Sequence, residues 1–239
     1  MTMMKTPNII FILLLSALVG VSAVMIGREL YLQQKEKKEF EELLEIVEVT
    51  ESTTAETESS AAETDTATES ETEAEVTATI VQSRNLAPLF EQNPECIGWI
   101  YIEGTNVNYP VMHTPDNPQK YLRKNFDGEY SQSGVPFLDA RCEVNGGTAI
   151  VYGHNMKNGT QFSDLKKYLD ADFRSSHPTI EFETEGGIRF YTVVDVIRTD
   201  IYDEIYNQIH TDDNTLILST CYGSAKSGRL LIIAKEATG

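Results

Sequence analysis

The stretch Thr215-Leu-Ile-Leu-Ser-Thr-Cys-Tyr-Gly-Ser-Ala-Lys-Ser-Gly-Arg-Leu-Leu-Ile-Ile-Ala234 holds two apolar runs on either side of a polar loop. Short apolar runs bounded by glycine and serine are typical of buried β-strands joined by a turn. The pattern predicts strands at residues 215–219 and 230–234. Cys221 then lies at the end of the first strand, and Arg229 opens the second.

Similar strand-like runs recur toward the N-terminus of this stretch, with glycines and turn residues between them. They occupy residues 99–102, 107–111, 148–152, 179–182 and 189–194. Helical spacing is limited to short segments at residues 86–90, 162–168 and 201–210. Many short strands with few helices favour a closed or nearly closed β-barrel. The sequence therefore predicts one mainly β domain over residues 80–239, long enough to bury its own core.

An uncharged apolar run covers residues 9–26, close to the ~20 residues that a helix needs to cross a membrane. The run exceeds the usual hydrophobic region of a cleaved signal peptide, which favours an uncleaved anchor over residues 1–27. Cleavage after Val21-Ser22-Ala23 remains the alternative. We expect a single-pass protein with its folded domain outside the cell, although Arg28 and Lys35 follow the span and oppose that orientation.

The segment after the span is acidic and simple in composition. Residues 40–49 have helical spacing, so we expect a helical stalk over residues 28–49, and residues 50–79 consist largely of Thr, Glu, Ser and Ala. Residues 39–83 carry fourteen acidic side chains and no Lys or Arg, so most of the net charge of −18 belongs here. Such a chain cannot bury enough apolar area to order itself. We expect a disordered linker that spaces the folded domain from the membrane.

Three cysteines are present, so at least one thiol is free of any disulfide within the chain. Cys96 and Cys142 are expected to be small buried hydrophobes, with a disulfide between them as the alternative. Cys221 differs, because a side chain between a strand end and a glycine-containing loop can face a cleft. We predict that Cys221 is a nucleophile.

Two further side chains fit nucleophilic chemistry. His154 follows a predicted strand in Val151-Tyr-Gly-His-Asn155, where an imidazole can transfer a proton. Arg229 would lie near the sulfur of Cys221 if their two strands pair, where it favours thiolate and stabilises an oxyanion. The alternative for Arg229 is a solvated charge at a strand edge. Spacing typical of metal ligands, phosphate loops and basic nucleic-acid patches is absent from the sequence, so we expect no metal, no cofactor and no nucleic acid.

The segment Leu218-Ser-Thr-Cys221, followed by Arg229, resembles the Leu-x-Thr-Cys…Arg signature of sortases. Val151-Tyr-Gly-His-Asn-Met156 resembles the catalytic-histidine segment of that family. Residues 98–111, 134–141 and 158–164 resemble its class B branch. The resemblance covers residues 84–236, and its motifs occur in the family's order and spacing.

The resemblance implies an eight-stranded sortase-type β-barrel with an N-terminal helical extension and short inserted helices. It implies that Cys221 attacks a peptide carbonyl in a C-terminal sorting signal of an exported protein, leaving a thioester. His154 would protonate the leaving amine, and Arg229 would hold the oxyanion or the substrate backbone. An amine from a cell-wall precursor or a pilin lysine would then resolve the thioester. Three neighbours are implied as substrate-cleft residues: Tyr152, Ser219 and Thr220.

Two positions depart from the family pattern. Ile217 stands where many sortases have Thr, and residues 194–216 are short for class B, where a long helix precedes the cysteine strand. The second departure leaves the sorting motif open and points toward a pilin-polymerising rather than a wall-anchoring member. Two other functions remain as alternatives: a thiol endopeptidase that hydrolyses the same signal, and a non-catalytic binding module tethered to the membrane.

Overall fold

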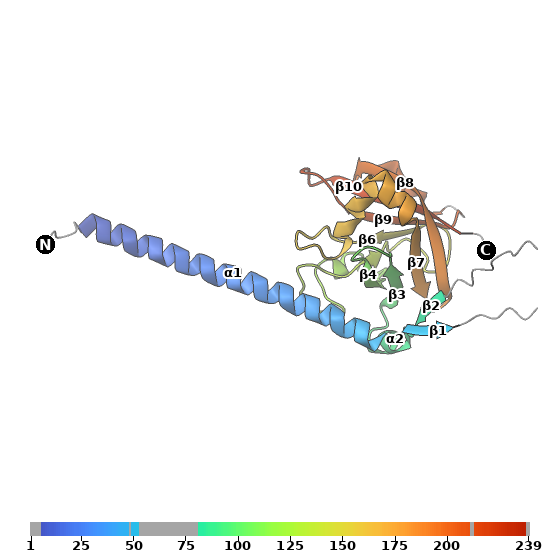
Figure 1. The fold of residues 1–239 in the computed structure, drawn as a ribbon, viewed down its shortest axis with the longest axis horizontal. Coiled ribbons are helices and arrows are strands. Elements are labelled where there is room, and N and C mark those ends of the chain that lie inside the picture. The colour runs from blue at the N-terminus through green and yellow to red at the C-terminus, as the bar shows by residue number, and fades with distance from the viewer. Residues whose placement is uncertain (1–5, 48, 53–80, 211–212, 238–239) are drawn as a thin grey trace, which may run out of the picture.

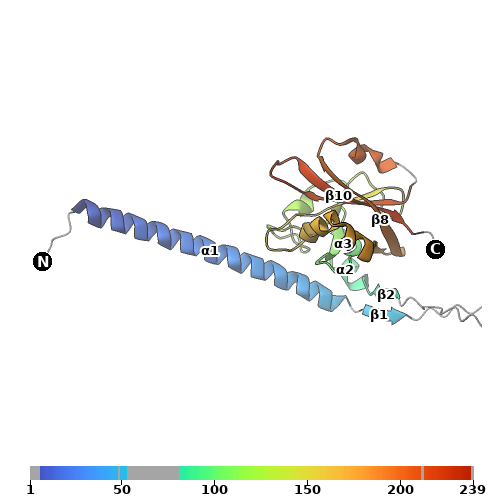
Figure 2. The ribbon, with the colours of Figure 1, turned by 45° about the horizontal axis from the view of Figure 1, so that its top comes forward.

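The computed structural model describes residues 6–47, 49–52, 81–210 and 213–237. It consists of one long N-terminal helix, α1 (Thr6–Ile46), and a β-barrel that packs against the C-terminal end of this helix (Figure 1). In Figure 2 the N-terminal half of α1 again extends away from the barrel.

Eight strands close the barrel in the order β10-β8-β7-β3-β4-β5-β6-β9. The β4–β5 and β6–β9 pairs are parallel, and the other neighbours are antiparallel. The strands are β3 (Cys96–Tyr101), β4 (Asn108–Met112), β5 (Phe137–Leu138), β6 (Ala149–Tyr152), β7 (Thr179–Thr184), β8 (Gly187–Asp200), β9 (Thr215–Cys221) and β10 (Gly228–Glu236). The mainly β, eight-stranded barrel with an N-terminal helix is confirmed.

Seven of these strands coincide with the apolar runs of the sequence, and β5 does not. Its two residues are too few to produce a periodic pattern, although both are buried. β9 shows why the others were recognisable: its first six residues are buried and only the last, Cys221, is exposed. A strand covered on both faces is apolar throughout, without alternation of polar and apolar residues.

Short helices connect the strands. The helical segments predicted at 86–90, 162–168 and 201–210 correspond to α2 (Ala87–Gln92), η2 (Phe162–Leu169) and η3 (Glu204–His210), of which the last two are 3₁₀ helices. η1 (Lys120–Leu122) and α3 (Ala171–Ser176) were not predicted. The N-terminus of α3 is capped by Asp170, whose carboxylate accepts two backbone N–H groups.

The apolar side chains form two clusters. One fills the barrel, with Ile150, Phe182 and Leu231 fully buried among others. The second lies between the barrel and the helices α1 and α2, where Leu43 of α1 and Trp99 of β3 are buried. The docked end of α1 is therefore part of the hydrophobic core.

α1 runs without a break through residues 6–27 of the predicted anchor and residues 28–46 of the predicted stalk. Its segment from Phe11 onward is long and apolar enough to cross a membrane, and the large apolar side chains at residues 11–26 are exposed. The continuity indicates that one rigid element joins this apolar segment to the barrel.

The acidic segment does not separate α1 from the barrel. β1 (Val49–Ser52) pairs antiparallel with β2 (Val81–Arg84), so the chain leaves and rejoins the described structure at neighbouring positions. Residues 50–52, predicted as disordered linker, belong to β1, and residues 53–79 of that linker lie outside the described residues. α1 itself packs on the barrel, and the role of residues 53–79 as a spacer stays a prediction.

Candidate active site

The strands β9 and β10 place Cys221 and Arg229 directly opposite each other. Residues paired in this way project their side chains on the same face of a sheet. The loop between them is closed by Tyr222 N, which donates to the Gly228 carbonyl at 3.0 Å. The Nη1 group of Arg229 donates to the carbonyls of Lys226 (3.1 Å) and Gly228 (2.9 Å). These bonds hold the guanidinium beside the loop that follows Cys221.

The parallel pair β6–β9 brings His154 to the same end of the barrel. Tyr152 is the register partner of Ser219, so His154 and Cys221 each lie two residues further along neighbouring strands. Past the strand ends, the Asn155 side chain donates from Nδ2 to the Cys221 carbonyl at 2.9 Å. The structure thus gathers the three predicted catalytic residues at one end of the barrel.

His154 is half-buried, and its Nε2 donates to the Leu122 carbonyl at 3.0 Å. Burial lowers the pKa of His154; the Leu122 carbonyl acts to raise it, and the positive charges of Arg123 and Arg229 lower it. Burial thus favours the neutral form of the ring. Since Nε2 carries the proton, Nδ1 is left as the acceptor nitrogen.

A glycine precedes His154 for a steric reason. A Cβ at position 153 would lie 2.5 Å from the ring of Phe162, which is fully buried. The backbone N–H of Gly153 donates to the Ser219 carbonyl at 3.1 Å, and its carbonyl accepts from the Thr220 hydroxyl at 2.7 Å. These two hydrogen bonds of Gly153 thereby fix the position of the His154 backbone relative to β9.

The three predicted substrate-cleft residues are engaged by protein partners. Ser219 and Thr220 are buried; the Ser219 hydroxyl lies 2.8 Å from the Tyr206 hydroxyl, and Thr220 bonds to Gly153. The Tyr152 hydroxyl donates to Asp139 at 2.8 Å. These three side chains therefore pack beneath the end of the barrel that holds Cys221 and His154. Their contact with a substrate stays a prediction.

Several residues around the site were missed from the sequence. Asn155 is adjacent to His154, and that adjacency was the one available signal. Tyr206 stacks on Tyr152 with ring centroids 6.3 Å apart, and no local pattern identified it.

Asp139 is a third such residue. Burial acts to raise the pKa of Asp139, but hydrogen bonds from Arg141 and Tyr152 outweigh the effect of burial and hold that pKa below its ordinary value. These contacts brace β6 against η3.

All three cysteines are free, so the alternative of a Cys96–Cys142 disulfide is wrong. Cys96 and Cys142 are buried, whereas Cys221 is exposed. Burial raises the pKa of the Cys96 thiol to about 12 and also raises the pKa of Cys142. Only Cys221 is placed to meet a substrate.

We expect an alkylating reagent at neutral pH to modify one thiol of the folded protein. Cys221 reacts because it is exposed, while Cys96 and Cys142 are inaccessible and protonated. Intact-mass measurement followed by peptide mapping identifies the site, and the denatured protein, which takes up three labels, is the control. Labelling of Cys96 or Cys142 at the rate of Cys221 in the folded protein would contradict the assignment.

Comparisons with known proteins agree with this geometry. A family model described as the Sortase domain matches residues 100–237. Sortase B of Listeria monocytogenes is 41% identical over 110 residues, which span 45% of this chain and 44% of that protein, less than half its length. Sortase B of Staphylococcus aureus is 31% identical over 185 residues, spanning 63% of this chain and 75% of that protein. The solved Staphylococcus aureus sortase B–substrate complex matches with a TM-score of 0.56 and 26% identity, covering 64% of this chain and 86% of that chain.

Proposed function

The chain belongs to the sortase family of cysteine transpeptidases, and on this premise we propose that it is a membrane-anchored class B-like sortase. It cleaves a sorting signal near the C-terminus of exported proteins and transfers the acyl part to an amine. The observation that carries the proposal is the exposed Cys221 paired with Arg229, at the barrel end that also holds His154. The similarity to a sortase B solved with its substrate supports a peptide substrate for this chain.

In the first half-reaction, the sulfur of Cys221 attacks the carbonyl carbon of the scissile peptide bond. The thiol proton passes to Nδ1 of His154, the acceptor nitrogen of the neutral ring. The C–N bond then breaks, and His154 returns the proton to the leaving amine. A thioester on Cys221 remains, so one difficult step becomes two easier ones.

Arg229 contributes a permanent positive charge to this half-reaction. It lies opposite Cys221 in the β9–β10 ladder, on the face where the substrate carbonyl is attacked. The same guanidinium stabilises the oxyanion that develops on the attacked carbonyl. Its bonds to the Lys226 and Gly228 carbonyls orient it before substrate binds.

In the second half-reaction, an acceptor amine attacks the thioester carbonyl, a new amide bond forms and the C–S bond to Cys221 breaks. The amine proton passes through His154 to the Cys221 sulfur, which restores the free thiol. A peptidoglycan precursor or a pilin lysine would supply the amine. If water took the place of the amine, the same residues would act as a thiol endopeptidase.

We place the barrel outside the cell, with the apolar part of α1 as its single membrane span. The exposed apolar side chains of residues 11–26 support this placement. The loops after β6 and between β9 and β10, yellow and orange-red in Figure 1, extend from the barrel on the side of the N-terminal part of α1. The candidate site then faces the membrane, where the C-terminal part of an exported protein emerges.

The full chain in detergent, incubated with a labelled sorting-signal peptide with and without an amine acceptor, tests the proposal. We expect an amide product that appears only with the amine and grows at the expense of the hydrolysed peptide. Hydrolysis that no amine diverts would establish the endopeptidase instead. Peptide binding without any turnover would establish a binding module.

An Arg229→Lys variant is expected to lose kcat/KM by roughly 10²-fold, because an ammonium cannot reproduce the paired donors of a guanidinium. The matched control is Lys226→Ala, which removes an exposed positive charge from the same loop and keeps the guanidinium. Steady-state assays of peptide cleavage compare the two variants. Near-wild-type turnover in Arg229→Lys would remove Arg229 from the reaction.

A further inference from the structure

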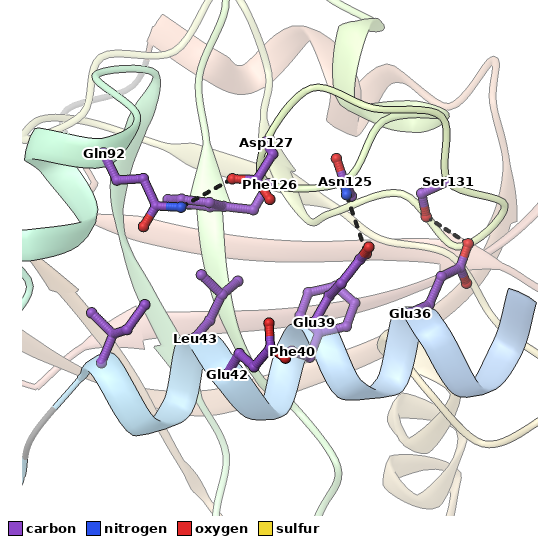
Figure 3. Close-up of a pocket in the computed structure, with 11 residues that line it drawn as sticks. Glu36, Glu39, Phe40, Glu42, Leu43, Gln92, Asn125, Phe126, Asp127 and Ser131 are labelled. Atoms are coloured by element: carbon purple, nitrogen blue, oxygen red, sulfur yellow. Dashed lines mark hydrogen bonds between the residues drawn. The ribbon is translucent and has the colours of Figure 1, made fainter.

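The docked part of α1 makes several polar contacts with residues 125–133, a loop between β4 and β5 (Figure 3). The Glu36 carboxylate accepts hydrogen bonds from the Ser131 hydroxyl (2.8 Å), the Gln132 backbone N–H (2.6 Å) and both the hydroxyl and the N–H of Ser133. One carboxylate thus satisfies four donors of a single loop.

The other contacts of α1 with this loop are weaker. Glu39 accepts one bond, from Asn125 Nδ2 at 3.1 Å. The ion pair between Lys35 and Glu129 has exposed fractions of 48% and 66%, so solvent screens it. Glu36 therefore carries most of the specific polar docking, next to the apolar packing of Leu43.

Gly134 connects residues 131–134 to the backbone of Leu122. The Ser131 hydroxyl also accepts from the Gly134 N–H at 3.0 Å, which joins Glu36 to Gly134. Gly134 has a φ of +60°, and a Cβ there would lie 2.4 Å from the Tyr121 carbonyl oxygen and 2.8 Å from that of Leu122. The Gly134 backbone is therefore packed directly on the Leu122 carbonyl.

The Leu122 carbonyl oxygen accepts the hydrogen bond from the Nε2–H group of His154, with an N–O distance of 3.0 Å. An unbroken series of contacts thus runs from Glu36 on α1, through residues 131–134 and Leu122, to the imidazole. Each link is a hydrogen bond or a close backbone contact, so the series leaves little freedom for the ring.

We propose that Glu36 is a positioning residue of the active site and that the docked part of α1 completes this site. By holding residues 131–134, it keeps the Leu122 carbonyl in place to fix the orientation and tautomer of His154. The inference rests on the proposed function of His154 as the proton carrier. It makes the helix that spans the membrane a structural part of the catalytic end, so that the barrel is fully competent only with α1 docked.

A Glu36→Ala variant of the full chain tests the proposal, with Glu45→Ala as its matched control. Glu45 is an exposed acid on the same helix, so both variants lose one negative charge from α1. We expect the rate of peptide cleavage to fall roughly tenfold in Glu36→Ala, as befits loss of one ordered hydrogen bond at His154. The Glu45→Ala rate stays at the wild-type value.

The titration of the His154 ring separates a positioning role from general destabilisation. NMR of the histidine-labelled protein follows this titration, and the His154 signal is identified because it is missing from the His154→Ala spectrum. Without the Leu122 bond, the pKa of His154 moves lower still, because burial and the charges of Arg123 and Arg229 act unopposed. Partial unfolding lowers the rate equally at every pH and leaves the titration of the folded fraction in place.

Glu36→Gln, which keeps the length of the side chain and one acceptor oxygen, covers the case in which Glu36→Ala does not fold. It should show both effects in smaller measure. A Ser133→Ala change should add nothing further to Glu36→Ala, because the two residues act through one contact. A His154 titration in Glu36→Ala and Glu36→Gln that matches Glu45→Ala would overturn the proposal. The NMR titration tests the role of Glu36 even if the wild-type chain transfers no peptide. A failure of the proposed function can therefore be distinguished from a failure of this proposal.

Discussion

A Cys221→Ala variant is expected to lose both cleavage and transfer of a sorting peptide, by at least about 10⁴-fold. The reason is chemical: the proposed reaction runs through a thioester, and alanine offers no atom that can form one. Neither of the other two thiols can substitute, because Cys96 and Cys142 are buried and have raised pKa values. Product formation, followed by chromatography over many wild-type turnovers, measures the loss.

Cys142→Ala is the matched control for this loss. It removes a thiol of the same chain that is buried in the barrel core, so it costs some stability and keeps the reaction. Peptide turnover that survives in Cys221→Ala would assign the nucleophile elsewhere.

A His154→Ala variant is expected to lose peptide cleavage by roughly 10³-fold, the usual scale of a positioned acid–base group. The thiol proton then has no carrier to the leaving amine. Because the loss concerns proton transfer, added imidazole should restore part of the rate. Initial rates with and without imidazole measure both effects.

His177→Ala serves as the control, since His177 stacks on Phe173 at the end of α3 and is not among the residues gathered at the catalytic end. It should retain the wild-type rate. A His154→Ala enzyme as fast as His177→Ala would exclude His154 as the proton carrier.

The lowered pKa of His154 also has a consequence for stability. Because the pKa of His154 is lower in the folded chain than in the unfolded chain, the folded chain binds fewer protons there at acidic pH. The contribution of the neutral His154 ring to the free energy of unfolding is fully present above the ordinary histidine pKa of 6.5. This contribution is lost as the pH falls from 6.5 through the lower folded-state pKa. As the pH falls through this interval, the free energy of unfolding of His154→Ala should therefore decrease less than that of the wild type.

The sequence predicted the barrel because most of its strands are covered on both faces and are apolar throughout. The short loop between two apolar runs made a pairing of Cys221 with Arg229 possible, and the structure shows that pairing. The position of His154 depends on the parallel pairing of β6 with β9, which joins segments far apart in the chain. Its place after a predicted strand suggested proton transfer, but only the family resemblance joined His154 to Cys221 in one site.

Other features depend on contacts that composition does not record. The acidic segment was assigned as a spacer from its lack of apolar residues, but the placement of α1 is set by Leu43 and by Glu36, whose partners lie about a hundred residues away. A carboxylate that anchors four donors looks the same in sequence as its solvated neighbours on the helix. The role of α1 at the site was therefore not readable from residues 28–49.

The most direct test of the central claim is the mass of the full chain, quenched in acid during the first turnovers with a sorting-signal peptide. The account predicts one acyl adduct, mapped to Cys221, with the mass of the N-terminal part of the peptide. Addition of an acceptor amine should remove the adduct and yield the amide product. Peptide cleavage with no adduct on Cys221, or an adduct that decays only to the free acid whichever amine is present, would contradict it.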